Sequence, residues 1–479
     1  MDKNREIISE LQNFFGSNAE NKAFNATLTV LDKITITNKT IGIEKKANCK
    51  FTFVQVLKLL ILFPFFSVKN AFHYTDSSLG KWFVCKKDMF YRFMNNSNVN
   101  WRRVLYSITK QIIGFTNRST TKCKQPRCLV LDDTDLRKRG DKAEGLGKIF
   151  SHTAMKCILG FKAMFLCLTD GVSQLMLDFT IQAEKGKDPD HPQGMTMKQI
   201  AAQYCPKRGD DEPVSARKNE MFKTKIKNAI SMLRTAISNG IRFDYLLVDS
   251  WFTCAEIVKF IHSRHLKCNF LGMIKMNCAK YMTKSGKLSA PEIIKRLQAN
   301  GFVKYSRSIR YHYAQIDAKY AGVKVRLFFY RKGKGSWNAL LTTDLNLDAK
   351  SAFRLYSMRW CIEVAHKEMK QLLHLGKCQS LNLAAQFASI SITAIQYNIL
   401  GYVKRKESYL TIGGLFASIT SQTVELTVAQ KIWNLILEVV NAIAELIACE
   451  TFDLIDSIIK DNEKVERLKI VFDKFSRAA

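Results

Sequence analysis

The sequence predicts an α/β chain, in which a central mixed β-sheet lies between helices and both ends of the chain are helical. Two short apolar runs, CLVLDD (128–133) and FDYLLVDS (243–250), have the length and composition of buried strands, and both end in acidic residues. Helical periods dominate before residue 120 and after residue 385. The sheet is therefore expected in the middle of the chain, with acids near its strand ends.

The composition is that of a globular protein with a polyanionic partner. The chain has 479 residues, of which 47% are hydrophobic and only 7 are prolines, so it is long enough for several packed domains. Lysine and arginine number 74 against 42 aspartates and glutamates, a formal charge of +32. Such an excess repels itself in a compact state unless a polyanion neutralises part of it. Nucleic acid is the expected partner, and an anionic membrane surface is the alternative.

No segment predicts a membrane span or a secretion signal. The best apolar run, FVQVLKLLILFPFF, is short, contains Lys58 and is broken by Pro64, which favours a buried helix. The opening residues, MDKNREIISELQNFF, lack the apolar stretch of a signal peptide. The 13 cysteines are scattered, as expected of reduced thiols. We therefore expect a cytoplasmic protein without membrane segments.

Residues 1–120 are expected to form a helical N-terminal region that binds DNA. Aromatic and cationic residues are mixed there, as in KWF (81–83), YRF (91–93) and WRR (101–103). A DNA-contacting helical domain has this mixture. Helix faces whose aromatic residues point into the core explain it about as well.

From residue 127 the pattern changes to strands mixed with helices. After the run at 128–133, two β-rich runs are joined by Asp170-Gly171, a strong hairpin signal. KNEMFKTKIKNAISMLRTAISNG (218–240) is a basic amphipathic helix stopped by Gly240. The run at 243–250 is followed by a further helix and a further strand.

This order of elements is the RNase H-like arrangement, a mixed sheet with helices on both faces. We assign residues 121–400 to an RNase H-like catalytic domain that carries a β-rich insertion at about 280–345. Residues 401–479 are expected to form a helical C-terminal region, which is a candidate for dimerisation.

The most informative stretch is LYSMRWCIEVAHKEMK (355–370), which spaces Tyr356, Arg359, Glu363 and Lys370 as Y-x2-R-x3-E-x6-K. On a helix these side chains fall on one stripe, and Lys367 joins them one turn beyond Glu363. A carboxylate flanked by cations and a tyrosine has the groups to hold a metal ion and to grip phosphates around it. The alternative is a solvated helix face with i,i+4 ion pairs, which contribute little.

Three acids are the candidate catalytic residues and metal ligands: Asp133, with its neighbour Asp132 as the alternative, Asp249 and Glu363. An RNase H-like sheet brings them together because its first and fourth strands are neighbours and a late helix packs across their ends. Three converging carboxylates hold two Mg²⁺ or Mn²⁺ ions ~3.5–4 Å apart, one at the attacking and one at the leaving oxygen of a phosphodiester.

Each of these acids also has a structural interpretation. Asp249 follows a buried strand and is well placed to cap the next helix or to make an Asx turn. Asp132 and Asp133 face opposite ways by strand alternation. Because basic residues 137–139 follow them, the segment can also be read as a charged turn.

With these residues in hand, the chain resembles the DDE transposases of bacterial insertion sequences, in the insertion sequence 4-like group. It matches the Y-x2-R-x3-E-x6-K signature of that group at all four positions. The first acid of the group lies in a hydrophobic-acid-Asp-Thr context, matched here by LDDT, which favours Asp133. VDSWF matches the context of the second acid loosely. The resemblance covers roughly residues 125–400, including a β-rich insertion of the kind that the group carries.

The resemblance implies metal-dependent cleavage at transposon ends, followed by strand transfer into target DNA by the liberated 3′-OH. It implies two Mg²⁺ ions as cofactor, for which Mn²⁺ substitutes. The implied partners are duplex DNA, as terminal inverted repeats and as target, and a second copy of the chain in a synaptic complex. The implied location is the bacterial cytoplasm, in association with the nucleoid when the protein is bound to DNA.

The resemblance also implies DNA contacts by particular residues. Tyr356, Arg359 and Lys370, together with Lys367, would contact phosphates near the cleaved end. Trp337, in SWNALLTT, would stack on a base, and a plain core or hairpin tryptophan is the alternative. Two other functions stay open: an RNase H-like nuclease or resolvase without strand transfer, and a non-catalytic DNA-binding protein derived from a transposase.

Overall fold

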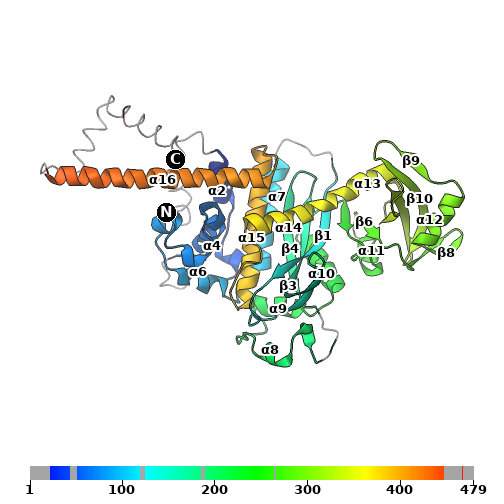
Figure 1. Ribbon diagram of the computed structural model, residues 1–479, viewed down its shortest axis with the longest axis horizontal. Helices are drawn as coiled ribbons and strands as arrows, with labels where there is room; N and C mark the ends of the chain where they lie inside the picture. Colours follow the sequence, from blue (N-terminus) through cyan, green and yellow to red (C-terminus); the bar gives the residue numbers. More distant parts are fainter. Residues whose placement is uncertain are drawn as a thin grey trace.

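The computed structural model describes residues 22–43, 51–118, 125–184, 188, 190–263, 266–446 and 467. Three parts follow one another along the longest axis of the molecule (Figure 1). The N-terminal helices lie toward one end, with helix α16 (Ile412–Leu446) extending beyond them. The core of a β-sheet lies in the middle, and a β-rich lobe around residues 280–331 lies at the other end. None of the described helices is both long and apolar enough to cross a membrane.

The first part of the described chain is helical, as expected. Its elements are α2 (Lys22–Lys33), α3 (Asn38–Ile41), α4 (Phe53–Leu62), α5 (Ser78–Trp82), α6 (Lys87–Met94) and α7 (Trp101–Arg118), with 3-10 turns at Phe63–Phe66 and Ala71–His73. The long apolar run becomes α4, which Thr52 and Gln55 start with a reciprocal capping box. Every residue of α4 after the first is buried, Lys58 included, which confirms the buried helix.

Five strands form the centre of the sheet: β1 (Cys128–Arg137), β3 (Lys156–Thr169), β4 (Gln174–Gln182), β5 (Tyr245–Val248) and β6 (Asn269–Ile274). Their order in space is β4-β3-β1-β5-β6. Strand β3 is antiparallel to β1 and β4, whereas β5 is parallel to β1 and β6. Three consecutive antiparallel strands, extended by two parallel strands beside the first, make the RNase H-like topology that the element order predicts.

The hairpin between β3 and β4 forms where the sequence places it. Gly171 has a φ of 84°, and the Asp170 carboxylate accepts hydrogen bonds from the backbone N–H groups of Val172 and Ser173. A short strand, β2 (Gly147–Ser151), pairs with the first part of β3 and has no counterpart among the predicted elements.

Strand β1 is longer than the apolar run that predicts it. It continues through Asp132 and Asp133 to Arg137, because β3 supplies a backbone partner for each of these residues. The acids therefore lie in the middle of an antiparallel ladder, and the alternative of a charged turn at DDT is wrong.

The two faces of the sheet bury different helices. Cys128 and Val130 of β1 belong to one core with α13 (Ala349–Ser357), α14 (Cys361–Leu372) and α15 (Leu383–Lys406). Leu129 and Leu131 belong to the other core with α10 (Lys225–Ser238), α11 (Ala255–Ile261) and α12 (Ala290–Ala299). Alternation along the strand thus separates an α14 face from an α10 face.

The helix predicted over 218–240 divides in two. Helix α9 (Pro213–Glu220) ends before residue 221, and the Thr224 side chain caps a new helix, α10, by accepting from the backbone of Lys227. Gly240, with a φ of 76°, ends this segment as expected. A further short helix, α8 (Met197–Ala201), lies in the long connection before α9.

The β-rich segment joins the core sheet instead of standing apart from it. Its elements are β7 (Lys280–Thr283), β8 (Gly286–Ser289), α12, β9 (Lys304–Ser306), β10 (Tyr311–Tyr320), β11 (Val323–Arg331) and β12 (Asn338–Thr342). Strand β12 pairs antiparallel with β6, and β11 pairs with β12, so one sheet of twelve described strands runs through both parts. The pairing covers the edge of β6 that an isolated core would leave open.

The signature stretch is helical but is not one regular helix. Helix α13 passes through a 3-10 turn at Met358–Trp360 into α14, so Tyr356 and Glu363 lie in different helices. Helix α15 is almost entirely buried between the sheet and the N-terminal helices. Helix α16 (Ile412–Leu446) follows and runs along α2 away from the sheet (Figure 1).

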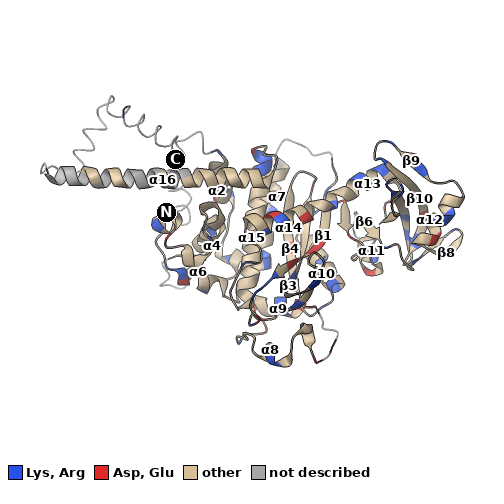
Figure 2. Cartoon of the chain, in the orientation of Figure 1, with Lys and Arg blue, Asp and Glu red and all other residues tan. Residues whose placement is uncertain are grey.

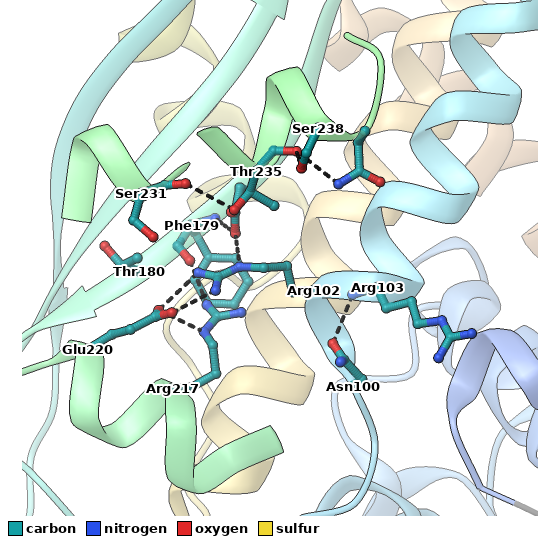
Figure 3. Close-up of polar contacts among 12 residues, drawn as sticks. Asn100, Arg102, Arg103, Phe179, Thr180, Arg217, Glu220, Ser231, Thr235 and Ser238 are labelled. Atoms are coloured by element: carbon teal, nitrogen blue, oxygen red, sulfur yellow. Dashed lines mark hydrogen bonds and ion pairs between the residues drawn. The ribbon is translucent and has the colours of Figure 1, made fainter. Parts of the chain in front are cut away.

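A buried ionic network fastens α7 to the sheet domain (Figure 3). The Arg102 guanidinium donates to Asp178 of β4 at 2.9 Å and to both carboxylate oxygens of Glu220 of α9 at 2.6 and 2.9 Å. Arg217 lies 3.4 Å from the same glutamate and donates to the Phe179 carbonyl. The N-terminal helices are therefore held to the sheet by charge as well as by apolar packing.

Candidate active site

The parallel register of β1 and β5 brings two acids together. Leu131 is paired with Val248, so the next residues of the two strands, Asp132 and Asp249, lie side by side. Neighbouring strands are ~4.8 Å apart, and residues paired in register point to the same face. Val130 and Leu247, two residues before each acid, pack in the core that contains α14. Asp132 and Asp249 are therefore on the α14 face.

Asp249 is held by the turn that follows β5. Its carboxylate accepts from the backbone N–H groups of Trp251 at 2.9 Å and Phe252 at 3.1 Å, which is the Asx turn that the sequence allows. The hydroxyl of Thr253 donates to the Asp249 carbonyl. One carboxylate oxygen makes both turn bonds, so no turn bond holds the other one.

Glu363, on α14, is linked to this pair of acids through Arg359. The Arg359 guanidinium donates to its carboxylate and also lies 3.6 Å from a carboxylate oxygen of Asp132. Arg359 is thus a cation between an acid of the sheet and an acid of the helix. The alternative interpretation of the signature, a solvated helix face, predicts an i,i+4 ion pair between Arg359 and Glu363. This ion pair does form, but it lies beside β1 and not on an open helix face.

Asp133 lies on the other face of the sheet. Its carboxylate accepts from the Lys225 ammonium, at the start of α10, at 2.7 Å. Asp133 also lines the depression between β1 and α14 that is described below. Strand β5 ends at Val248, so this part of β1 has no partner on that side among the described strands.

Burial raises the pKa of Asp132 to about 7, against the opposing effect of Arg359. The charges of Asp133 and Asp249 raise it further. A carboxyl group whose pKa is raised by burial and by neighbouring carboxylates, as that of Asp132 is, is typical of a functional site.

An open depression of about 440 Å³ lies between β1 and α14. Its lining consists of Asp132, Asp133, Thr134, Glu363, His366, Lys367, Lys370 and Gln371. Lys370 donates to the Thr134 hydroxyl at 2.7 Å. Burial lowers the pKa of Lys370 and raises that of Tyr356, whose pKa also responds to Arg359 and Asp249. Glu363 and Lys370 of the signature therefore line the depression, whereas Arg359 lies beside Asp132 and Tyr356 is close enough to Asp249 for its pKa to respond.

Three lining residues, Thr134, His366 and Gln371, were not among the predicted catalytic, metal-binding or DNA-contacting residues. Thr134 has the same strand parity as Asp132, a signal that alternation supplies once Asp132 is placed on the α14 face. His366 is buried against Phe165, and no described residue hydrogen-bonds its Nε2 atom. Burial and the neighbouring Lys370 lower the pKa of His366 to about 3, so the imidazole is neutral.

Trp337 directly precedes β12. It packs against the core of the α10 face, with the Arg331 guanidinium 4.7 Å from its ring centre. Its stacking on a base stays a prediction.

The site contains carboxylate oxygens, the ligand type that a hard cation prefers, but these oxygens are not grouped around a common point. Among the described residues, no three histidine, cysteine, aspartate or glutamate side chains are grouped closely enough to hold a metal ion as they stand. The donors themselves fit, because carboxylate oxygens are the ligands that Mg²⁺ and Mn²⁺ prefer. The positive charge of the Arg359 guanidinium, between Asp132 and Glu363, occupies the position where a metal cation would be expected.

Comparison with known proteins gives the following similarities. Residues 84–270 match the family described as DDE superfamily endonuclease, and residues 218–399 match the family described as transposase DDE domain. No curated protein matches. A cryo-EM structure of the piggyBac transposase synaptic complex with hairpin DNA is similar at 12% identity and a TM-score of 0.41, over 88% of this chain and 81% of that one.

Proposed function

We propose that this protein, a DNA transposase of the DDE type, cuts and joins DNA at a site built from Asp132, Asp249 and Glu363. The observation that supports this choice is the β1–β5 register, which sets Asp132 beside Asp249 on the face that α14 covers. Asp133, which the family context favours, is the alternative first acid, but it is engaged by Lys225 on the α10 face.

The proposed cofactor is a pair of Mg²⁺ ions, for which Mn²⁺ substitutes. When bound, two such ions activate the attacking oxygen and stabilise the leaving oxygen of a phosphodiester. Asp132 and Asp249 present oxygens from two adjacent strands, which fixes their separation. Glu363 presents its oxygens from a helix and completes the set once Arg359 releases it.

The cations of the insertion sequence 4-like signature would bind the DNA backbone. Arg359, released from the acids, presents a planar fork that suits a phosphate. Lys370 and Lys367 line the same depression, and their charges oppose the negative charge that builds on the phosphate in the transition state. The Tyr356 hydroxyl keeps its proton, because burial raises its pKa, so it acts as a hydrogen-bond donor.

The rest of the chain would serve DNA binding and assembly. Lysine and arginine positions occur on the N-terminal helices, on α10 and throughout the β-rich lobe, whereas acidic positions of β1 and α14 lie in the centre (Figure 2). We assign DNA binding to the N-terminal helices, catalysis to residues 121–400, and a homodimer contact to the helices after residue 401. The terminal inverted repeats and a target duplex are the proposed substrates, in the cytoplasm of a bacterium.

A cleavage and joining assay tests this function. Duplexes taken from the DNA that flanks the gene serve as candidate ends, with a supercoiled plasmid as target and Mg²⁺ or Mn²⁺ added. The expected result is cut ends and joined product with the wild-type protein, and neither with Glu363→Gln. If the wild type and the variant both bind DNA and are equally inert, the protein is a DNA-binding derivative. If the wild type cuts but never joins, it is a nuclease.

A further inference from the structure

Beside the acids, on the other side of the sheet, lies a surface that the proposed chemistry does not use. Trp251, two residues after Asp249, exposes 45% of its surface. Phe222, just before α10, exposes 54%. Three lysines, Lys223, Lys225 and Lys227, follow Phe222 in the sequence, and one of them, Lys225, lies against the Trp251 ring. Large exposed aromatics next to lysines are the usual elements of a surface for single-stranded nucleic acid.

The Trp251 ring is held in position from two sides. Its backbone N–H is bonded to the Asp249 carboxylate, and its ring meets the buried Phe252 ring edge to face, with centres 4.9 Å apart. The Lys225 ammonium lies 5.0 Å from the centre of the Trp251 ring. A ring fixed in this way loses little freedom when it binds a ligand.

Asp133 acts in this arrangement as an anchor. Its carboxylate holds the Lys225 ammonium at 2.7 Å, and both side chains are largely buried. The acid on the α10 face therefore fixes the lysine, and the lysine supports one side of the exposed ring. The Asp133–Lys225–Trp251 chain leaves the rest of the ring open to solvent.

We propose that Trp251 is a stacking platform for an unpaired nucleobase of the DNA strand that leaves the catalytic acids. Lys223 and Lys227, both exposed, contact the phosphates on either side of that base. Charge decides the occupant. Lys225 lies beside the ring, and the exposed Lys223 and Lys227, two residues before and after Lys225 in the chain, favour a polyanion over an apolar peptide. A single strand is favoured over a duplex because bases in a duplex stack on one another and hide their faces. The inference rests on the proposed function only for the origin of the strand.

Binding measurements without divalent ions test the platform, since no cutting occurs in EDTA. The probes are a 20-base-pair hairpin duplex with a six-nucleotide single-stranded tail, the same molecule with an abasic tail, and the blunt duplex. Sequence is arbitrary because stacking tolerates any base. We expect the wild-type protein to prefer the normal tail to the abasic tail by about 5- to 150-fold, the range for one stacked base. A 2-aminopurine in the tail should change its fluorescence on binding.

Matched variants identify the residue. Trp251→Ala should abolish the preference for the normal tail and leave blunt-duplex affinity within about twofold, whereas Trp251→Phe should keep most of the preference. Tyr204→Ala, which removes an aromatic with 42% exposure, should change nothing. Lys223→Gln should lower the slope of log affinity against log salt on the tailed probe by about 0.7.

The proposal is overturned if the wild type shows no preference for the normal tail, or if Trp251→Ala keeps it. It is equally overturned if Trp251→Ala weakens binding to all three probes alike, since the ring then has a structural or duplex role. Near-ultraviolet circular dichroism and thermal unfolding confirm that each variant folds. Glu363→Gln should retain the full preference, so a failure of the catalytic assignment leaves this result intact.

Discussion

Asp132 and Asp133 are consecutive residues of one strand, yet their side chains lie on opposite faces of the sheet. Asp132 lies beside Asp249 and Arg359, whereas Asp133 is bound to Lys225. The pair is a matched comparison, because both are aspartates with equal backbone pairing to β3.

Substitution of each neighbour by asparagine should separate catalysis from anchoring. Asp132→Asn is expected to reduce DNA cleavage by about 100-fold or more, since it removes a charged metal ligand. Asp133→Asn should reduce cleavage by less than about tenfold. Rates of single-turnover cleavage with Mg²⁺ check this. The assignment is wrong if the two variants exchange these results.

Stability should show the same asymmetry and a defined pH dependence. The pKa of Asp132 is raised above its unfolded value, to about 7, so the folded protein holds this proton more tightly than the unfolded chain does. Its contribution to stability is therefore most favourable at low pH and is lost as pH rises from about 4 to about 7.

Asp132→Asn should accordingly raise the free energy of unfolding by on the order of 1–4 kcal/mol at pH 8 and by much less at pH 4.5, in EDTA. Asp133→Asn should lower it, because the largely buried Lys225 loses its partner. Urea unfolding at both pH values measures the effect. Equal effects of Asp132→Asn at pH 4.5 and pH 8 would show that its ionisation is not linked to folding.

Arg359 and a divalent cation require the same carboxylate oxygens. Arg359→Gln should therefore raise the affinity for Mn²⁺ by about tenfold, since a charge-assisted hydrogen bond contributes on the order of 1.5–3 kcal/mol. Lys370→Gln is the control, because Lys370 donates to the Thr134 hydroxyl and not to an acid. Isothermal titration calorimetry gives both affinities. A larger gain for the lysine variant would mean that only the local charge matters.

The ionic network around Arg102 should be a major attachment of the N-terminal helices. Arg102→Ala leaves the Asp178 and Glu220 carboxylates buried with too little positive charge, and should cost about 3–5 kcal/mol of unfolding free energy. The neighbour Arg103, whose side chain is exposed, serves as the control, and Arg103→Ala should change stability by less than about 0.5 kcal/mol. Urea unfolding of both variants, followed by circular dichroism, makes the comparison. Similar losses for both variants would contradict the role of the network.

The sequence predicts the sheet well because local signals and topology agree there. The apolar runs at β1 and β5, the Asp170-Gly171 hairpin and the buried helix α4 all have short-range causes in apolar composition or turn chemistry. The length of β1 does not, since its polar second half becomes a strand only through pairing with β3. The pairing of β12 with β6 is also a long-range event that periodicity cannot reveal.

The candidate site could be predicted in its residue types and only partly in its geometry. Spacing alone identifies Glu363, Arg359 and Lys370, because a helix puts them on one side. The choice between Asp132 and Asp133 depends on which face α14 covers, which is a property of packing and not of local sequence. The 3-10 turn between α13 and α14 is likewise not indicated by the spacing of the signature. The stacking role of Trp337 stays a prediction, and its ring packs against the core of the α10 face.

Anomalous diffraction from crystals soaked in Mn²⁺ would show which carboxylates bind the metal. We expect manganese on the α14 face, bound by carboxylate oxygens of Asp132 and Asp249, with Glu363 turned from Arg359 toward the metal and a second ion ~3.5–4 Å away when DNA is present. Manganese bound by Asp133 on the α10 face, or no ordered manganese near any of these acids at saturating concentration, would contradict this expectation.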